Sequence, residues 1–545
     1  METTGIVLLL LAAVVLSGAI ARISRLPLPL PLVQIALGAF VDAFGNLGVV
    51  LNPEIFFLVF LPPLLFLDGW RIPKERLLRD RWTVLELALG LVVFTVLGVG
   101  YFVHWMIPSM PLAVAFALAA ILSPTDPVAV SAIAKRVPIP GRLLHILEGE
   151  SLLNDASGLV CMRFAVAAAL TGAFSLTDAL GTFVWLALGG LFIGWAVTWV
   201  IVTAKNWVFR HFGEEPGAQV LISLLIPFGA YLVAEEFHCS GILAAVAAGV
   251  SMGYAEQSGQ AAAQTRMRRN AVWDTVAFAA NGIIFVLLGE QLPQIVMGAV
   301  RVVRDTGHRD VAWLAVYVVA ITAALALLRF LWVWASLRFT LARATHRQET
   351  SYAPSWRLIM AASLAGVRGA ITLAGVLTLP LLMPNGDPFP ARELAVFLAA
   401  GVIIVSLVSA SVGLPRLLKN LEIPPEPSQQ AEEDLTRVAA AKAAIEAVEH
   451  ALREEAGTKI NDLYPEAGAR IVELYRQRIN GLSKTGDDGV HQRKLENIER
   501  RLRLSALRAE RNEIYRLARA RRISEETARK LVSEVDLLET RFSTA

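Results

Sequence analysis

Long apolar stretches divide the chain, and this pattern constrains its fold more than any other feature. Apolar stretches of about 17 to 25 residues can cross a bilayer as helices. They lie near residues 5–21, 28–44, 54–69, 82–105, 111–134, 144–170, 177–203, 218–237, 240–254, 272–289, 311–339, 356–382 and 393–417. Only 18% of the 545 residues are charged, whereas soluble proteins have about 25%. We therefore predict an all-α polytopic membrane protein with about thirteen transmembrane helices.

The distribution of basic residues predicts the orientation of these helices. Lys and Arg gather in alternate loops, as the positive-inside rule requires of cytoplasmic loops, and the loop with Arg301, Arg304 and Arg309 is an exception. The first apolar stretch is followed, not preceded, by Arg22 and Arg25, which is the wrong order for a cleaved signal peptide. We expect a plasma (inner) membrane protein whose N-terminus lies outside and whose C-terminus is cytoplasmic.

The composition changes after the last apolar stretch and predicts three parts. Residues 1–420 form the membrane domain, and residues 421–428 form a stiff linker that contains Pro424-Pro425-Glu426-Pro427. Residues 429–545 are rich in Ala, Glu, Arg, Lys and Leu with helical spacing, which indicates a soluble helical tail. Its charges are expected to form a solvated face. A regulatory tail that binds a partner is the alternative.

The stretch 144–170 carries polar groups near its middle. A charge near the centre of a bilayer costs about 2.5 kcal/mol or more, so an acid there is a candidate functional residue. Ser151 and Asp155 lie one turn apart on one helix face, and Glu150 and Asn154 lie on the adjacent face. Gly158 keeps the first face narrow enough for another backbone to approach. The alternative is a helix end that dips into water.

Two apolar stretches are expected to be broken helices. Ser123-Pro-Thr-Asp-Pro127 places two prolines in the fifth stretch, where they remove backbone donors and disrupt the helix. Gly366-Val-Arg-Gly-Ala370 places a charge between glycines in the twelfth. With the seventh stretch as a linker, these positions correspond in two inverted repeats of about six helices each, a pattern typical of transporters. A simple proline kink is the alternative for the first break.

Arg329 is a further charge inside an apolar stretch, and it needs an acidic partner. Glu150 is the natural candidate, because it does not share the face of Asp155. The alternative is that Arg329 extends to the membrane surface. Arg163 is assigned no role in ion binding, and Glu235 and His238 are interpreted as residues of an outside loop.

Four segments together resemble sodium/proton exchangers of the cation/proton antiporter-1 family. They are Ser123-Pro-Thr-Asp-Pro-Val-Ala-Val130, Glu148-Gly-Glu-Ser-Leu-Leu-Asn-Asp155, Tyr231-Leu-Val-Ala-Glu-Glu-Phe-His-Cys-Ser-Gly-Ile242 and Ala365-Gly-Val-Arg-Gly-Ala370. The resemblance covers most of residues 5–417. It implies a homodimer in which each protomer has a dimerisation domain and a mobile core domain that holds the ion.

The resemblance also implies roles for individual residues. Asp155 would carry the proton or the cation, and Ser151, the Thr125 backbone and Asp126 would be further cation ligands. Asn154 would orient Asp155, Glu150 would pair with Arg329, and Arg368 would offset the dipole charge of the second broken helix.

These residues suggest a mechanism of exchange. In a partly dry cavity, proton and cation are expected to compete for Asp155, and the bare carboxylate is too costly to move. One monovalent cation, Na⁺ or else Li⁺ or K⁺, would then exchange for one proton without net charge movement. A K⁺/H⁺ antiporter is the closest alternative. A cation channel is another, but filter-like repeats are missing from the sequence.

No cofactor, nucleic acid or enzymatic activity is expected. Cys161 and Cys239 both lie in apolar stretches, so they form neither a disulfide framework nor a thiolate metal site. An intramembrane hydrolase that uses Asp126 and Asp155 is the enzymatic alternative, but no nucleophile motif stands in a suitable context.

Overall fold

The computed structural model describes residues 2–23, 29–45, 53–72, 74, 85–126, 141–172, 176–213, 215–257, 263–305, 312–346, 356–419, 429–455, 463–482 and 487–543. These residues are almost entirely helical, and an isolated bridge between Leu382 and Pro388 is the one β-type pairing among them. The chain separates into two compact units, Met1–Leu421 and Glu422–Ala545. The all-α fold predicted from the sequence is confirmed.

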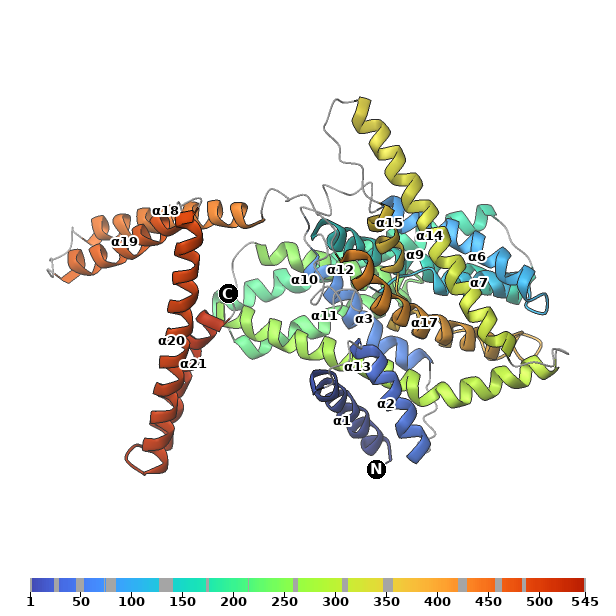
Figure 1. Ribbon diagram of the computed structural model, residues 1–545, viewed down its shortest axis with the longest axis horizontal. Coiled ribbons are helices and arrows are strands. Elements are labelled where there is room, and N and C mark those ends of the chain that lie inside the picture. The colour runs from blue at the N-terminus through green and yellow to red at the C-terminus, as the bar shows by residue number, and fades with distance from the viewer. Residues whose placement is uncertain are drawn as a thin grey trace. The chain divides into compact units, whose positions relative to one another are not determined.

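Each predicted apolar stretch of the first unit corresponds to a helix or to a pair of helices (Figure 1). The helices are α1 (Glu2–Ile23), α2 (Leu30–Gly45), α3 (Pro53–Arg71), the π-helix η1 (Glu86–Leu91) with α6 (Val92–Met106), α7 (Leu112–Leu122), α9 (Gly141–Thr171), α10 (Leu176–Phe212), α11 (Pro216–Glu236), α12 (Gly241–Gln257), α13 (Ala263–Asp305), α14 (Ala312–His346), α15 (Trp356–Leu364), α16 (Ala370–Leu377) and α17 (Arg392–Leu418). Seven helices of the described residues are long and apolar enough to cross a membrane. The total of thirteen spans and the inverted repeat stay predictions.

Helix α13 is much longer than the predicted stretch 272–289, and its ends correct the sequence interpretation. The predicted stretch stops before Glu290, but Glu290 is buried and the helix continues to Asp305. Arg301, assigned above to a loop, therefore lies near the C-terminal end of α13, where a cation suits the helix dipole. At the other end Arg269 is helical and buried, because it forms an ion pair with Glu256 of α12.

The two predicted breaks lie side by side. Helix α7 ends at Leu122, and residues 123–126 are not helical; the second half of that predicted stretch lies outside the described residues. Residues 365–369 separate α15 from α16. The backbone N–H of Asp126 donates a hydrogen bond of 2.7 Å to the carbonyl of Val367. This bond joins the two non-helical segments directly.

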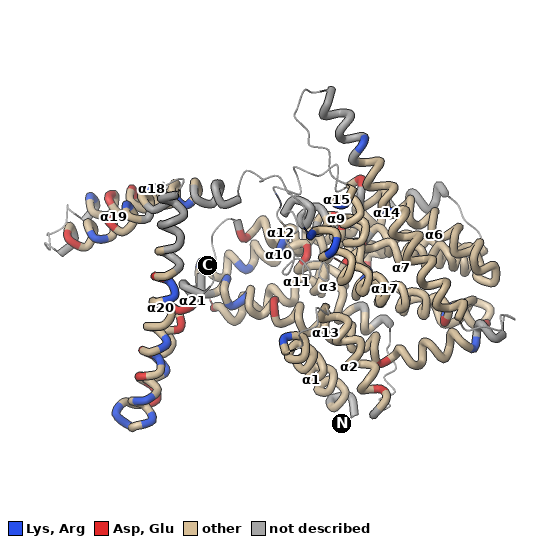
Figure 2. Tube along the Cα trace, in the orientation of Figure 1, with Lys and Arg blue, Asp and Glu red and all other residues tan. Residues whose placement is uncertain are grey.

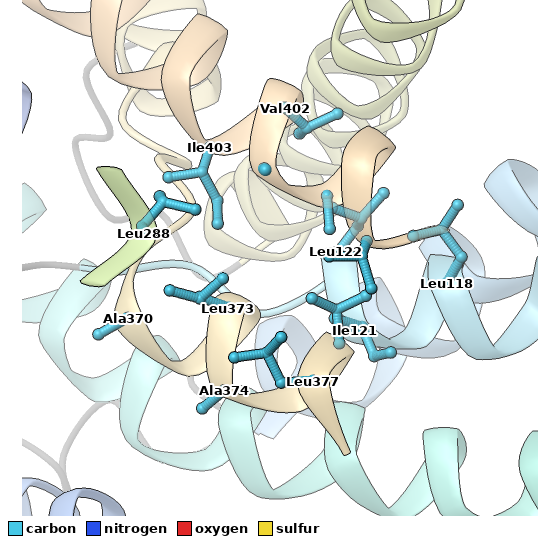
Figure 3. Close-up of a cluster of buried hydrophobic side chains, with 14 of the residues drawn as sticks. Leu118, Ile121, Leu122, Leu288, Ala370, Leu373, Ala374, Leu377, Val402 and Ile403 are labelled. Carbon is cyan, nitrogen blue, oxygen red and sulfur yellow. The ribbon is translucent and has the colours of Figure 1, made fainter. Parts of the chain in front are cut away.

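The helices of the first unit form two groups. We call α1–α3 and α10–α13 the panel, and we call η1, α6, α7, α9 and α14–α17 the core bundle; each group packs mainly within itself. In the core bundle the two half-helices α7 and α16 pack on α17 through apolar side chains, among them Leu122, Leu373 and Ile403 (Figure 3). Helices α13 and α17 connect the two groups.

Glycines bring the backbones of the panel helices into contact. A Cβ atom on Gly249 of α12 would overlap the carbonyl oxygen of Phe66 in α3, and one on Gly69 of α3 would overlap the carbonyl oxygen of Val246. Such reciprocal contacts of small residues allow close helix packing without a large apolar interface.

The described residues of the second unit form four helices, α18 (Gln429–Glu455), α19 (Leu463–Leu482), α20 (Asp487–Arg519) and α21 (Glu525–Ser543). Helix α18 packs against α19, and α20 packs against α21 around a small core that includes Ile514, Val532 and Val535. Acidic and basic residues are frequent along these helices (Figure 2). The predicted helical tail is therefore present, whereas its regulatory role stays a prediction.

Candidate functional site

A cavity of about 280 Å³ lies between the panel and the core bundle. The core bundle contributes Asp155 and Ser151 of α9, the segment Pro124–Asp126 and the start of α16. The panel contributes the start of α2, the end of α3 and the middle of α13. The two breaks and the polar face of α9 therefore open into one space, and the opposite wall belongs to the other group of helices.

Asp155 lines this cavity although its side chain is buried, with 3% of the residue exposed. No hydrogen bond joins it to another of the described residues, and the carboxylates of Asp68, Asp126 and Glu150 act on it electrostatically. A carboxylate in this setting presents its oxygens to the cavity, where a cation or a proton can neutralise it.

The non-helical segment before Pro127 is bound to α9. The Ser151 hydroxyl donates to the Thr125 carbonyl at 2.7 Å, and the Asn154 amide donates to the Thr125 hydroxyl at 3.0 Å. A Cβ atom on Gly158 would meet the ring of Pro124, so the predicted close approach at Gly158 is confirmed. Thr125 and Ser151, both proposed as cation ligands, thus face the cavity as one bonded unit beside Asp155.

The geometry of Asn154 differs from the expectation that it orients Asp155. Its amide donates to Thr125 and, at 3.5 Å, to Glu150, and it makes no hydrogen bond to Asp155. The physical reason is that consecutive residues of a helix point about 100° apart. Asn154 therefore binds Thr125, which lines the cavity beside Asp155.

Glu150 and Arg329 form a buried pair with two hydrogen bonds, at 2.5 Å and 2.7 Å. The Nε atom of Arg329 also donates to the Ala362 carbonyl of α15 at 3.0 Å. Gly366 provides space for the arginine, because a Cβ atom there would meet its side chain. The pair connects α9, α14 and α15, and each charge offsets the desolvation of the other.

Arg368 lies in the second break and binds the ends of two half-helices. Its Nε atom donates to the Leu122 carbonyl at 2.8 Å, and its Nη1 atom donates to the Gly366 carbonyl. The Leu122 carbonyl ends α7, where the helix dipole is negative, and Gly366 lies in the break, two residues after the end of α15. The carboxylate of Asp126 packs against Gly369, which precedes α16, and the positive end of that helix dipole suits an anion.

Several lining residues were missed because they belong to other apolar stretches. Asp68 lies near the end of the apolar stretch 54–69 and was assigned no role, and Asn281 of α13 is an uncharged residue in a long apolar run. Gln34 and Thr372 also line the cavity. The only sequence signal that could have identified them is a polar residue within an apolar stretch. The structure also joins Arg163 to Glu235 through an ion pair, although no contact between these two residues was predicted from the sequence.

Comparisons with known proteins agree with this arrangement. The chain is similar to the uncharacterized Na⁺/H⁺ exchanger YjcE of Escherichia coli K12, with 42% identity over 99% of this chain and 98% of the relative. It is also 38% identical to the sodium, potassium, lithium and rubidium/H⁺ antiporter of Bacillus subtilis 168, over 99% of this chain and 78% of that protein. Both matches include the helical tail.

A solved structure has the same fold. The sodium proton antiporter MjNhaP1 of Methanocaldococcus jannaschii superposes with a TM-score of 0.57 at 20% identity, over 77% of this chain and 99% of that one. The family model described as "Sodium/hydrogen exchanger, transmembrane" matches residues 9–420. This protein is therefore a multi-pass membrane protein that belongs to the sodium/hydrogen exchanger family.

Proposed function

We propose that the protein exchanges a monovalent cation for a proton by alternating access, with Asp155 as the shared site. The observation that carries this proposal is a buried carboxylate, open to a cavity that lies between two separate groups of helices. Transporters built this way move one group against the other around a site near the middle of the membrane. The B. subtilis relative, named for four alkali cations, supports Na⁺ as substrate with K⁺ as the alternative.

Four groups are proposed to hold the cation: the carboxylates of Asp155 and Asp126, the Ser151 hydroxyl and the Thr125 carbonyl. All four residues line the cavity. The Thr125 carbonyl accepts the Ser151 hydrogen bond with one lone pair, and its second lone pair remains for a cation. The Ser151 hydroxyl directs its proton to Thr125, so its oxygen lone pairs are likewise left for the ion.

The cost of a bare buried carboxylate couples the two fluxes. Asp155 is buried in the core bundle, and an unpaired charge there is too expensive to carry through the membrane. The core bundle can therefore move when Asp155 holds a proton or a cation, and not when it holds neither. Because Glu150 is already neutralised by Arg329, one cation exchanges for one proton and the cycle is electroneutral.

The remaining assignments follow from the predicted orientation. We infer a plasma membrane location, an outside N-terminus and a cytoplasmic tail, as the positive-inside rule predicts. The half-exposed lining residue Arg71 then marks the cytoplasmic end of the cavity, so the cavity faces inward. A homodimer is a further proposal, which rests on the family resemblance. A regulatory tail is another, which rests on the separate helical unit that follows the membrane domain.

Proteoliposomes with a trapped pH dye test the proposed function. Na⁺ and then K⁺ are added with and without a clamped membrane potential, for the wild type, for Asp155→Asn and for Glu499→Gln, which alters an exposed tail carboxylate. Proton movement should require the cation, ignore the potential, vanish in Asp155→Asn and persist in Glu499→Gln. Movement that persists in Asp155→Asn would place the proton site elsewhere, and a rate that follows the potential would exclude one-for-one exchange.

A further inference from the structure

Helix α9 makes a polar contact with the panel outside the cavity. Arg163 lies about two turns after Asp155 on α9, and its Nη2 atom donates a hydrogen bond of 3.1 Å to the Glu235 carboxylate of α11. Arg163 belongs to the core bundle and Glu235 belongs to the panel. This ion pair therefore joins the two groups of helices through the same helix that carries Asp155.

The Glu235 carboxylate is held in place by the turn between α11 and α12. His238 has the left-handed φ of 51° that reverses the chain, and the N–H of Cys239 closes the turn with a 2.7 Å bond to the Ala234 carbonyl. The N–H of Gly241, at the start of α12, donates to the same Glu235 oxygen that Arg163 binds. The panel thus presents a fixed acceptor, and separation of the pair requires Arg163 to move with the core bundle.

The pair and the exposed end of the cavity lie at opposite ends of α12. This helix has 17 residues, which corresponds to about 25 Å. Gly241 at its N-terminal end binds Glu235, whereas Glu256 near its C-terminal end accepts a 2.6 Å hydrogen bond from Trp70. Trp70 precedes Arg71, a half-exposed residue of the cavity wall. The pair therefore joins the two groups of helices on the side away from the exposed end of the cavity.

We propose that Arg163 and Glu235 form a latch that stabilises the state in which the cavity is open at the Arg71 end. The inference rests on the proposed alternating-access function: the pair must separate when the core bundle presents Asp155 to the other side. Both side chains are partly exposed, at 42% and 36%, so the latch shifts the balance between the two states by at most about fivefold. A weak latch suits a carrier, which must populate both states.

Cross-linking tests whether the pair separates during transport. Both native cysteines are removed by Cys161→Ala and Cys239→Ala, and Arg163→Cys and Glu235→Cys are added. A bifunctional methanethiosulfonate with a spacer as long as the replaced side chains then links the two positions. The link should abolish Na⁺-dependent proton movement, and a reductant should restore it. A linked protein, verified by mass spectrometry, that exchanges at the rate of the reduced protein would overturn the latch.

The matched control is an exposed Arg–Glu pair that cannot separate. Glu499 and Arg503 form an ion pair of 2.8 Å within the single helix α20, and Glu499→Cys with Arg503→Cys is treated with the same reagent. This link should leave transport unchanged. Loss of transport in this control as well would show that the reagent acts elsewhere, and arrest by the first link would then no longer support the latch.

A second measurement does not depend on transport. Asn281→Cys, in the background without native cysteines, places a thiol on the cavity wall, and a membrane-impermeant maleimide labels it from the Arg71 side. Arg163→Glu or Glu235→Arg alone should slow this labelling by up to about fivefold, and the two together should partly restore it. Equal labelling in all variants would overturn the latch. Absence of cation-driven proton movement in the wild type would instead refute the proposed function.

Discussion

The panel and the core bundle are stabilised by different interactions. In the panel, glycines bring backbones into direct contact, and Trp273 stacks on Phe66 in the interior with ring centroids 5.2 Å apart. In the core bundle, two helices are broken, and arginine side chains donate hydrogen bonds to buried backbone carbonyls at the breaks. The panel is thus a closely packed support, whereas the core bundle contains a polar interior in which Glu150, Arg329 and Arg368 are held by their partners. The difference explains why the candidate ion site lies on the core side of the cavity.

The largest effect should follow from breaking the charge pair of the core bundle. Arg329→Met leaves Glu150 buried without its two hydrogen bonds, and the loss of one partner of such a pair costs about 3–5 kcal/mol of unfolding free energy. Unfolding of the purified protein in detergent measures this loss. Glu150→Gln combined with Arg329→Met removes both charges and should be less destabilised than Arg329→Met alone. Wild-type stability of Arg329→Met would contradict the assigned role of the pair.

An added side chain should destabilise the panel through its backbone contacts. Gly249→Leu would overlap the Phe66 carbonyl, and overpacking of this kind costs about 1–3 kcal/mol. The matched control is Gly181→Leu in α10, where a Cβ atom meets nothing within 4 Å and leucine is the better helix former. The same unfolding measurement compares the two variants. Equal stability would mean that close contact is not what holds the panel together.

A comparable effect should link stability to ion binding in the core bundle. Thr125→Val removes the hydroxyl that accepts the Asn154 amide at 3.0 Å, and an unsatisfied buried amide costs about 1–3 kcal/mol. Because Thr125 also supplies a proposed ligand carbonyl, the apparent cation affinity measured in proteoliposomes should fall too. Thr125→Ser keeps the hydroxyl and should restore both properties. An unchanged cation affinity in Thr125→Val would show that the hydrogen bond from Asn154 to Thr125 does not affect cation binding.

The smallest effect should come from a single hydrogen bond of the panel. Trp273→Phe keeps an aromatic ring against Phe66 but loses the 3.2 Å hydrogen bond from the indole to Ser223. The expected loss is about 0.5–1.5 kcal/mol, measured by unfolding, with the cation affinity unchanged. A lowered cation affinity would show that the panel does more than support the core bundle.

Local sequence signals predict the breaks and the charge pair. Pro124 and Pro127 remove backbone donors on either side of Asp126, a charge within an apolar stretch, and a lone arginine in an apolar stretch requires a buried acid. These features follow from the missing backbone donor of proline and from the cost of a charge in an apolar environment. The sequence alone is therefore enough to identify them. The apolar stretches are predictable for the same reason, because the bilayer sets their length.

Contacts between distant helices were not predictable in the same way. Asp68 and Asn281 reach the cavity because α3 and α13 pass beside it, and no periodicity of their own stretches indicates this. Arg163 meets Glu235 for the same reason. Arg269 lies before the predicted stretch 272–289, where its charge indicates a loop. In the structure it is helical, and Glu256 and the Trp70 ring cover it. Tertiary packing decides these cases.

The most direct test of the account is to count the protons released when a cation binds. Calorimetric titration of the purified protein with Na⁺, in buffers with different ionisation enthalpies and at a pH where Asp155 is protonated, gives this number without any transport step. If Asp155 is the shared site, each bound Na⁺ should release one proton, and Asp155→Asn should neither bind Na⁺ nor release a proton. Na⁺ binding without proton release, or binding that survives in Asp155→Asn, would contradict a single carboxylate shared by the two ions.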